Sequence, residues 1–286
     1  MPSRKIDKPV AASIARAIDE LRATRPLVHC ITNYVTVNDC ANALLAVGGS
    51  PVMADDEAEA AEIAAIAGAL VINIGTLNAR TVKSMEIAGA EAARRGIPVV
   101  LDPVGVGASR LRTETALSLV GKIPFAVIRG NASEIRVLAT GTGSTRGVDA
   151  CAEDSSSVAG IRKAAEAFAR KTGAVVAITG ATDIVTDGAR TFAVRNGHPL
   201  MGEITGSGCM LSAVIGAYAG SAASAARDAR FLETTAAALC GMGLAGERAA
   251  RRAKRLGTGS FRAALIDALS GLDSRAVSRG MKIDAL

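Results

Sequence analysis

Short apolar runs alternate along the chain with longer segments rich in Ala, Glu, Arg and Leu. Most of these runs are continuous rather than alternating with polar residues, which is typical of strands buried on both faces of a parallel sheet. We expect such strands at residues 27–32, 52–54, 69–75, 98–104, 125–130 and 174–179. The segments of high helix propensity predict helices over residues 56–67, 78–95, 155–172 and 209–246. The repeated strand–helix order predicts an α/β fold with a mostly parallel central sheet flanked by helices on both faces.

The strand–helix order changes after Thr179. Two short β-rich runs, residues 183–186 and 191–194, are separated by a segment that contains Asp187-Gly188, a pair that favours a tight turn. This pattern predicts a late antiparallel hairpin.

The chain has no segment that reads as a linker between domains. Residues 140–157, rich in Gly, Ser and Thr, predict a long surface loop, but elements of the same kind resume after it. A chain of 286 residues is long enough to bury a large core. We therefore expect a single domain over residues 1–286, with flexible ends at 1–11 and 273–286.

Composition narrows the range of partners. Aromatic residues make up only 2% of the chain, which disfavours a nucleic-acid binder that stacks bases on aromatic rings. The formal charge of +6 permits attraction to anions. The longest apolar stretch, residues 63–74, is too short to span a bilayer, and the first residues lack the apolar core of a secretion signal. We therefore expect a cytoplasmic protein that binds neither membrane nor nucleic acid.

The five cysteines form no Cys-x-x-Cys pair, and the two histidines are not spaced as metal ligands. This argues against a zinc site. In a reducing compartment each thiol is either a small core side chain or a reactive group.

Polar residues follow several of the predicted strands, where an open parallel sheet binds its ligands. Asn33 follows the first strand and could anchor a ligand, although a helix cap explains an Asn or Thr there equally well. Asp102, in Asp102-Pro103, is a candidate for a metal or phosphate site, with a turn-forming Asp-Pro as the alternative. Arg129 lies at a strand end, where it could contact phosphate, and Glu134 opens the next helix.

The segment 202–210 is the most informative one, because its glycine-rich loop leads into a small-residue apolar helix. Such a loop gathers unpaired N–H groups at the positive end of the helix dipole, so Gly206, Ser207 and Gly208 predict an anion hole. Cys209 falls in the first helical turn, where the dipole and those N–H groups favour thiolate over thiol. The alternative is a small buried Cys on a tightly packed helix.

Two other phosphate-binding patterns can be tested. The chain has no Gly-x-x-x-x-Gly-Lys-Ser/Thr motif, which excludes a P-loop nucleotidase. Gly241, Gly243 and Gly246 spell Gly-x-Gly-x-x-Gly, but they follow a helical segment rather than a strand. Close helix packing explains these glycines better than a dinucleotide site.

Five motifs together resemble the hydroxyethylthiazole kinase family over roughly residues 12–272. They occur in the family's order, at residues 29–36, 102–105, 129–134, 178–180 and 206–209. The resemblance implies a ribokinase-like fold and transfer of the ATP γ-phosphate to the primary alcohol of 4-methyl-5-(2-hydroxyethyl)thiazole. This reaction would serve thiazole salvage for thiamine biosynthesis.

The resemblance also implies roles for individual residues. Asn33, Met53 and Gly206 would contact the thiazole, and Arg129 and Thr179 would contact ATP. Asp102 and Glu134 would help to hold Mg²⁺ and its waters. Cys209 would be the catalytic base, where most ribokinase-like relatives carry Asp. The family further implies a homotrimer, in which Asn33 and Met53 of one chain face Gly206 and Cys209 of the next.

Other functions stay open at this point. A hydroxymethylpyrimidine kinase of the same fold is the closest alternative, followed by a ribokinase-like dehydratase that repairs hydrated nicotinamide nucleotides. Both are expected to carry Asp at the position of Cys209, which argues against them. A non-catalytic or redox function would rest on the Gly-x-Gly-x-x-Gly pattern alone.

Overall fold

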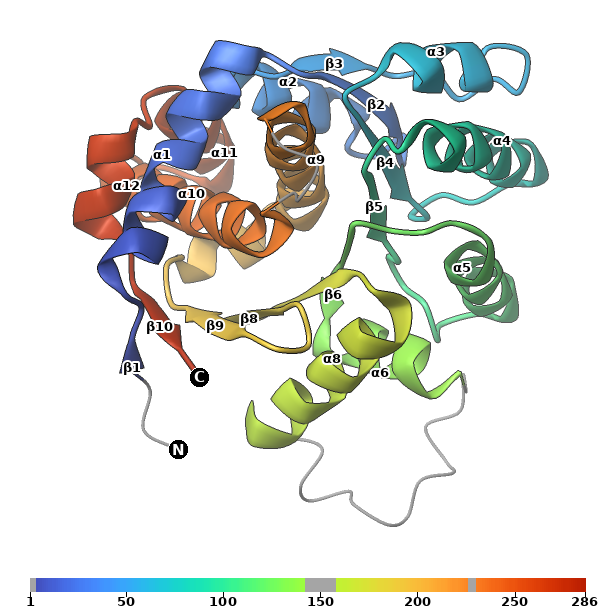
Figure 1. Ribbon diagram of the computed structural model, residues 1–286. Coiled ribbons are helices and arrows are strands. Elements are labelled where there is room, and N and C mark those ends of the chain that lie inside the picture. The colour runs from blue at the N-terminus through green and yellow to red at the C-terminus, as the bar shows by residue number, and fades with distance from the viewer. Residues whose placement is uncertain (1–3, 142–157, 226–229) are drawn as a thin grey trace.

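One sheet, with ten strands in the described residues, runs through the protein (Figure 1). The computed structural model describes residues 4–141, 158–225 and 230–286. The strand order is β1-β10-β9-β8-β7-β6-β5-β4-β2-β3. Strands β2 to β7 are parallel, and β8, β9, β10 and β1 extend the sheet in antiparallel fashion. This confirms the mostly parallel sheet and the late hairpin.

The predicted strands are present with small shifts in their bounds. The parallel part consists of β2 (Leu27–Ile31), β3 (Ser50–Val52), β4 (Ala69–Asn73), β5 (Val99–Asp102), β6 (Val127–Asn131) and β7 (Val175–Thr179). The antiparallel part consists of β8 (Asp183–Thr186), β9 (Thr191–Val194), β10 (Ile283–Ala285) and β1 (Arg4–Lys5). Strand β3 precedes its predicted position at residues 52–54, because its pairing with β2 begins at Leu27 opposite Ser50.

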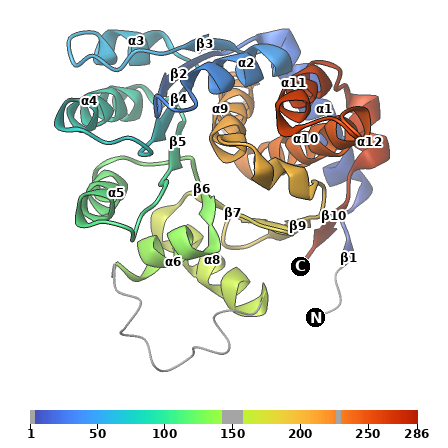
Figure 2. The same ribbon diagram turned by 180° about the vertical axis from the view of Figure 1, so that it is seen from behind.

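The central strands are buried on both faces, as their continuous apolar runs predict. Along β4, for example, Leu70 and Ile72 belong to one core cluster, whereas Val71 between them belongs to the other. Figures 1 and 2 show the resulting three layers, with α1, α2 and α9–α12 on one side of the sheet and α3–α6 and α8 on the other. Apolar burial on both faces therefore holds the sheet between two helical layers.

The helices on the two faces have the following bounds. On the first face lie α1 (Lys8–Thr24), α2 (Val37–Val47), α9 (Ser207–Ala225), α10 (Phe231–Arg252), α11 (Thr258–Ser270) and α12 (Ser274–Gly280). On the second face lie α3 (Ala60–Ile66), α4 (Ala79–Arg95), α5 (Arg110–Lys122), α6 (Ala132–Thr140) and α8 (Val158–Thr172). A short 3₁₀ turn, η1 (Pro199–Glu203), precedes α9. No helix of the described ranges combines the length and the apolar character that a membrane crossing requires.

One expectation about element limits needs correction, and two others concern the chain ends and the loop. The segment 209–246 forms two helices, α9 and α10, which pack against each other rather than continuing as one. The ends expected to be flexible contain regular structure, since β1 pairs with β10 and β10 with β9. The expected loop over residues 140–157 lies, from residue 142 on, outside the described residues.

The glycines of the Gly-x-Gly-x-x-Gly pattern lie within α10 and are buried. A Cβ on Gly243 would come within 2.5 Å of the Asn196 backbone carbon, so this glycine allows the chain after β9 to approach the helix closely. The pattern is a packing feature and not a dinucleotide-binding loop, as its helical context predicts.

Candidate active site

The candidate site lies where the parallel strands end. The carboxyl ends of β4 and β5 place Asn73 directly opposite Asp102, and those of β6 and β7 place Asn131 opposite Thr179. Helix α9 packs on β2, β4 and β5. The strand-end loops and the start of α9 therefore meet at one edge of the sheet.

Asp102 is completely buried at the end of β5. Its Oδ2 accepts hydrogen bonds from Asn73 Nδ2 and Ser212 Oγ, both at 2.8 Å. Its Oδ1 accepts none from the described residues and lies 3.6 Å from Arg129 Nη1. Burial raises the pKa of this carboxyl to about 6, against the opposing effect of Arg129. Asp102 is thus a strand residue held by partners from other elements, not a turn-forming residue.

Arg129 connects Asp102 with the end of β7. Its Nη2 donates a hydrogen bond to Thr179 Oγ1 at 2.7 Å, while its Nη1 faces Asp102. A Cβ on Gly208 would lie 2.7 Å from Nη1, so the guanidinium rests directly against the first turn of α9. Because a cation is repelled by the positive end of a helix, this arrangement favours an anionic ligand beside it.

The loop before α9 needs a glycine at position 206. Gly206 has φ +87°, and a Cβ there would collide with the side chain of Thr36. The N–H of Met210 donates to Gly206 O at 2.8 Å as the helix starts. Ser207 is the first residue of α9. Residues 206–208 therefore form a glycine turn that leads into the N-terminus of α9.

Cys209 is half-buried in the first turn of α9. Its Sγ accepts hydrogen bonds from Asn33 Nδ2 at 3.2 Å and from Asn73 Nδ2 at 3.3 Å. Cys209 also packs against the apolar core cluster, so its sulfur lies between that core and two amide donors.

Glu134 lies in the first turn of α6. Its Oε2 accepts from the N–H of Asn131 at 2.8 Å in a capping box, and its Oε1 accepts from the N–H of Gly105 at 2.8 Å. Asn131 is the cap of this helix. Glu134 thus joins the loop after β5 to the start of α6 and keeps both loops beside Asp102.

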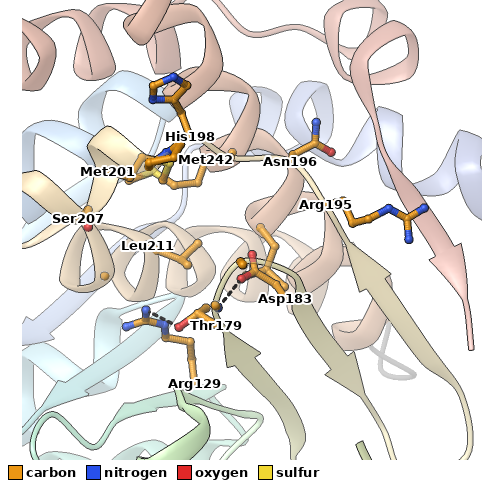
Figure 3. A pocket seen from close by; sticks show the side chains of 18 residues that line it. Arg129, Thr179, Asp183, Arg195, Asn196, His198, Met201, Ser207, Leu211 and Met242 are labelled. Atoms are coloured by element: carbon orange, nitrogen blue, oxygen red, sulfur yellow. Dashed lines mark hydrogen bonds between the residues drawn. The ribbon is translucent and has the colours of Figure 1, made fainter. Parts of the chain in front are cut away.

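A cavity of about 580 Å³ opens beside Arg129 and Thr179 (Figure 3). The segments that line it are the ends of β6 and β7, the chain after β9, and parts of α9 and α10; its lining includes Arg129, Thr179, Asp183, Asn196, His198, Ser207, Gly208 and Met242. Figure 3 shows Arg195 directed toward β10, where it pairs with Asp284. Arg129 is therefore the cation that the strand edge presents to this cavity beside the helix N-terminus.

The family model and the relatives most similar in sequence all name the same family. The family model for the hydroxyethylthiazole kinase family matches residues 18–275. A hydroxyethylthiazole kinase from Ruminiclostridium cellulolyticum is 48% identical over 96% of this chain and 97% of its own. One from Clostridium acetobutylicum is 52% identical over 90% of this chain and 93% of its own.

This chain belongs to the hydroxyethylthiazole kinase family. The structure of the protein of that name from Pyrococcus horikoshii matches with a TM-score of 0.84 at 40% identity, covering 96% of this chain and 98% of the other. A ribokinase-like superfamily protein from Enterococcus faecalis shares the fold, with a TM-score of 0.60 at 13% identity over 95% of this chain and 96% of its own. The expected ribokinase-like fold is thereby confirmed.

The family resemblance led us to expect Asn33 and Cys209 from different subunits, and this division is wrong for these two residues. Asn33 Nδ2 contacts Cys209 Sγ within one chain, and Asn33 Oδ1 accepts from the hydroxyl of Thr36, which packs against Gly206. The reason is that β2 lies beside β4 and α9 covers both strands. Met53 follows the edge strand β3 and packs against the same apolar cluster as Cys209.

Three residues of the site were not identified from the sequence. Asn73 contacts both Asp102 and Cys209, Ser212 contacts Asp102, and Asp183 lines the cavity, where burial raises its pKa to about 6. A local signal existed only for Asn73, the single hydrogen-bonding side chain in the apolar run 69–75. Ser212 resembles an ordinary helix residue and Asp183 an ordinary residue at the start of a strand until their partners are known.

Asp102 should give the unfolding free energy a measurable pH dependence. Burial raises the pKa of the folded carboxyl to about 6 from its usual 3.8, so between these values the folded protein binds more protons than the unfolded chain. The contribution of Asp102 to the unfolding free energy therefore falls as the pH rises through this window, and it is constant above it.

Asp102→Asn removes this titration. We expect the wild type to lose up to about 1.4 kcal/mol of unfolding free energy per pH unit relative to the variant within the window. Urea denaturation at several pH values between 4 and 7, without added magnesium, measures the difference. A difference that is the same at every pH would contradict the prediction.

Proposed function

We propose that this protein transfers the γ-phosphoryl group of ATP to the primary alcohol of 4-methyl-5-(2-hydroxyethyl)thiazole, and so serves thiazole salvage for thiamine biosynthesis. The observation that carries the proposal is the identity of about half of all residues to hydroxyethylthiazole kinases over nearly the full length of both chains. The arrangement of residues at the strand ends supports it with a cation, a helix N-terminus and a partly exposed sulfur side by side.

ATP is proposed to bind with its phosphates against Arg129, Thr179 and the first turn of α9. Phosphoryl transfer requires mainly positioning and neutralisation of charge on the phosphate oxygens. Arg129 supplies a fixed positive charge, and the N–H groups of residues 206–208 supply donors that need no rearrangement during the reaction. The rest of the nucleotide would occupy the cavity between the chain after β9 and α10.

The carboxylates of Asp102 and Glu134 fit a Mg²⁺ ion that accompanies the nucleotide. Asp102 Oδ1 is buried without a hydrogen-bond donor among the described residues, its nearest cation being Arg129 Nη1 at 3.6 Å, and Glu134 lies on the adjoining loop. Within those residues no three His, Cys, Asp or Glu side chains are grouped to hold a metal ion. One or two carboxylates completed by water and phosphate are typical of Mg²⁺, which when bound would neutralise charge on the phosphate oxygens.

Cys209 is proposed to accept the proton of the alcohol. In this step the alcohol oxygen forms a bond to the γ-phosphorus, the bond to the ADP oxygen breaks, and the alcohol proton moves to Sγ. The two amide donors that reach Sγ interact more strongly with an anionic sulfur than with a neutral one. Asn33, Met53 and Gly206 would place the thiazole ring so that its hydroxyethyl group meets Cys209.

A homotrimer is also part of the proposal. Tyr34 and Val35, directly after Asn33, are 74% and 61% exposed, although both side chains are largely apolar. Exposed apolar side chains beside a site are favourable positions for burial between subunits. Three subunits related by cyclic symmetry would then carry equivalent sites.

The substrate assignment predicts which alcohols support ADP release. In a coupled assay we expect turnover that requires both Mg²⁺ and the thiazole alcohol, with ribose and hydroxymethylpyrimidine as poor substrates. The reason is that Cys209 stands where pyrimidine kinases of this fold are expected to carry a carboxylate. Equal or faster turnover of the pyrimidine alcohol would replace the proposal by a hydroxymethylpyrimidine kinase.

The role of Cys209 can be separated from that of the anion hole. Cys209→Ala should lower kcat by about 10²–10⁴-fold, the usual contribution of a general base, and leave the KM for ATP nearly unchanged. Cys209→Asp should retain activity, because the amides of Asn33 and Asn73 can donate to a carboxylate as they do to sulfur. Steady-state kinetics of both variants measure these effects.

Cys30→Ala is a matched control, because Cys30 is a buried core residue on β2. It should keep the wild-type kcat. If Cys209→Ala turns over like the wild type from pH 6 to 9, the sulfur is not the base, and catalysis rests on the anion hole and Mg²⁺.

The homotrimer predicts a mass in solution three times that of one chain. Multi-angle light scattering of the active enzyme measures it directly. Tyr34→Ser together with Val35→Ser should weaken the assembly, because burying these side chains would supply part of its free energy. An active monomer in the wild type would reject the trimer.

A further inference from the structure

The side chain of Asn73 lies between Asp102 and Cys209 and is 2% exposed. Its Nδ2 donates to Asp102 Oδ2 at 2.8 Å and to Cys209 Sγ at 3.3 Å. Its Oδ1 accepts from Asn33 Nδ2 at 3.1 Å and from the N–H of Gly75 at 2.9 Å. Both protons of its amide and both lone pairs of its carbonyl therefore have partners.

These partners leave only one orientation for the Asn73 amide. The backbone N–H of Gly75 can only donate, so the atom facing it is the carbonyl oxygen. On the opposite side, an ionised Asp102 can only accept, so the atom facing it is the amide nitrogen. Rotation of the amide by 180° would place two acceptors together and two donors together.

The same argument orients Asn33. Its Oδ1 accepts from the backbone N–H of Thr36 at 3.1 Å, which directs its Nδ2 toward Asn73 and Cys209. Two amide nitrogens, each with a fixed orientation, thus point at one sulfur. Sγ of Cys209 is an acceptor toward both, and any hydrogen it carries must point away from them, into the part of the site where Cys209 is exposed.

We propose that Asn73 is a positioning residue for the reaction, which holds the sulfur of Cys209 as a hydrogen-bond acceptor and sets its place relative to the Asp102 carboxylate. At 2% exposure it does not meet substrate itself. It acts through Sγ, which it keeps directed toward the substrate, and it joins the sulfur to the carboxylate by a single rigid amide.

The kinetic part of this inference rests on the proposed role of Cys209 as the base, so the test needs a readout that does not depend on turnover. Alkylation by iodoacetamide, followed at the Cys209 peptide by mass spectrometry, provides one. In this reaction Sγ attacks the iodine-bearing carbon and iodide leaves. Its rate reports directly how reactive the sulfur is.

Asn73→Ala removes one of the two donors to the sulfur. We expect alkylation of Cys209 at pH 7.5 to slow by about fivefold or more, because a hydrogen bond to an anionic acceptor is among the stronger ones. In turnover, kcat for the thiazole alcohol should fall by about tenfold, with the KM for ATP within about twofold of the wild type.

Asn73→Asp serves as a second variant, because it preserves the shape of the side chain in this buried position. A carboxylate oxygen then replaces the N–H that faces the sulfur, so alkylation should be at least as slow as in Asn73→Ala. Circular dichroism and thermal unfolding establish that each variant is folded before its rate is compared.

Ser212→Ala is the matched control. Ser212 gives Asp102 Oδ2 a hydrogen bond of the same 2.8 Å length as Asn73 does. Its hydroxyl makes no hydrogen bond with Cys209 among the described residues, so alkylation should stay within about twofold of the wild-type rate. Equal slowing in Ser212→Ala would mean that the effect passes through Asp102 and would overturn the proposal.

The proposal would also be overturned if Cys209 were alkylated at the wild-type rate in both Asn73 variants. If alkylation slows but kcat does not change, Asn73 positions the sulfur and the sulfur is not the base. That outcome contradicts the proposed role of Cys209 in turnover, and with it the kinetic part of the inference. Failure of the positioning role of Asn73 can therefore be distinguished from failure of the proposed role of Cys209 as the base.

Discussion

The buried carboxylate of Asp102 is the constraint on which the site depends. An ionisable group with no exposure is strongly destabilising unless hydrogen bonds or an opposite charge compensate for its lost solvation. Here the compensation comes from Asn73 on β4, Arg129 on β6 and Ser212 on α9. The Asp102 carboxylate therefore has partners on both neighbouring strands and on one helix.

This requirement fixes the position of one turn of α9, which otherwise packs on the sheet through apolar side chains. Ser212 can reach Asp102 only if its turn of α9 lies over the end of β5. The preceding turn, residues 207–209, is then carried to the edge of the sheet, and the glycine at 208 lets the Arg129 guanidinium rest against it. The hydrogen bond from Ser212 to the buried Asp102 carboxylate thus accompanies the close placement of the α9 N-terminus, the Arg129 guanidinium and the Cys209 sulfur.

Arg129 faces the partner carboxylate of Asp102 in one direction and the positive end of α9 in the other. Asp183 is the acidic residue of the cavity lining, while Arg129 and the helix N-terminus both favour an anionic group beside them, such as a phosphate. The sulfur of Cys209 lies on the other side of the same turn, toward Asn33 and Asn73, so the turn separates a region suited to anions from one suited to an alcohol.

Local patterns in the sequence determined the parallel strands, the hairpin, and the candidates Asn33, Asp102, Arg129 and 206–209, because burial on both faces and a glycine turn before a helix are properties of short segments. They also showed that Gly241, Gly243 and Gly246 belong to a helix. The pairing of β1 with β10, and the break between α9 and α10, were not visible locally because distant packing decides them.

Only the tertiary structure identified Asn73 and Ser212 as parts of the site and brought Asn33 to Cys209 within one chain. The hydrogen bonds concerned join residues separated by 40 positions for Asn33 and Asn73, 110 for Asp102 and Ser212, and 176 for Asn33 and Cys209. Residues so far apart leave no shared periodicity in the sequence. Their contacts exist because parallel strands end at a common edge and α9 crosses it, which is a property of the folded sheet.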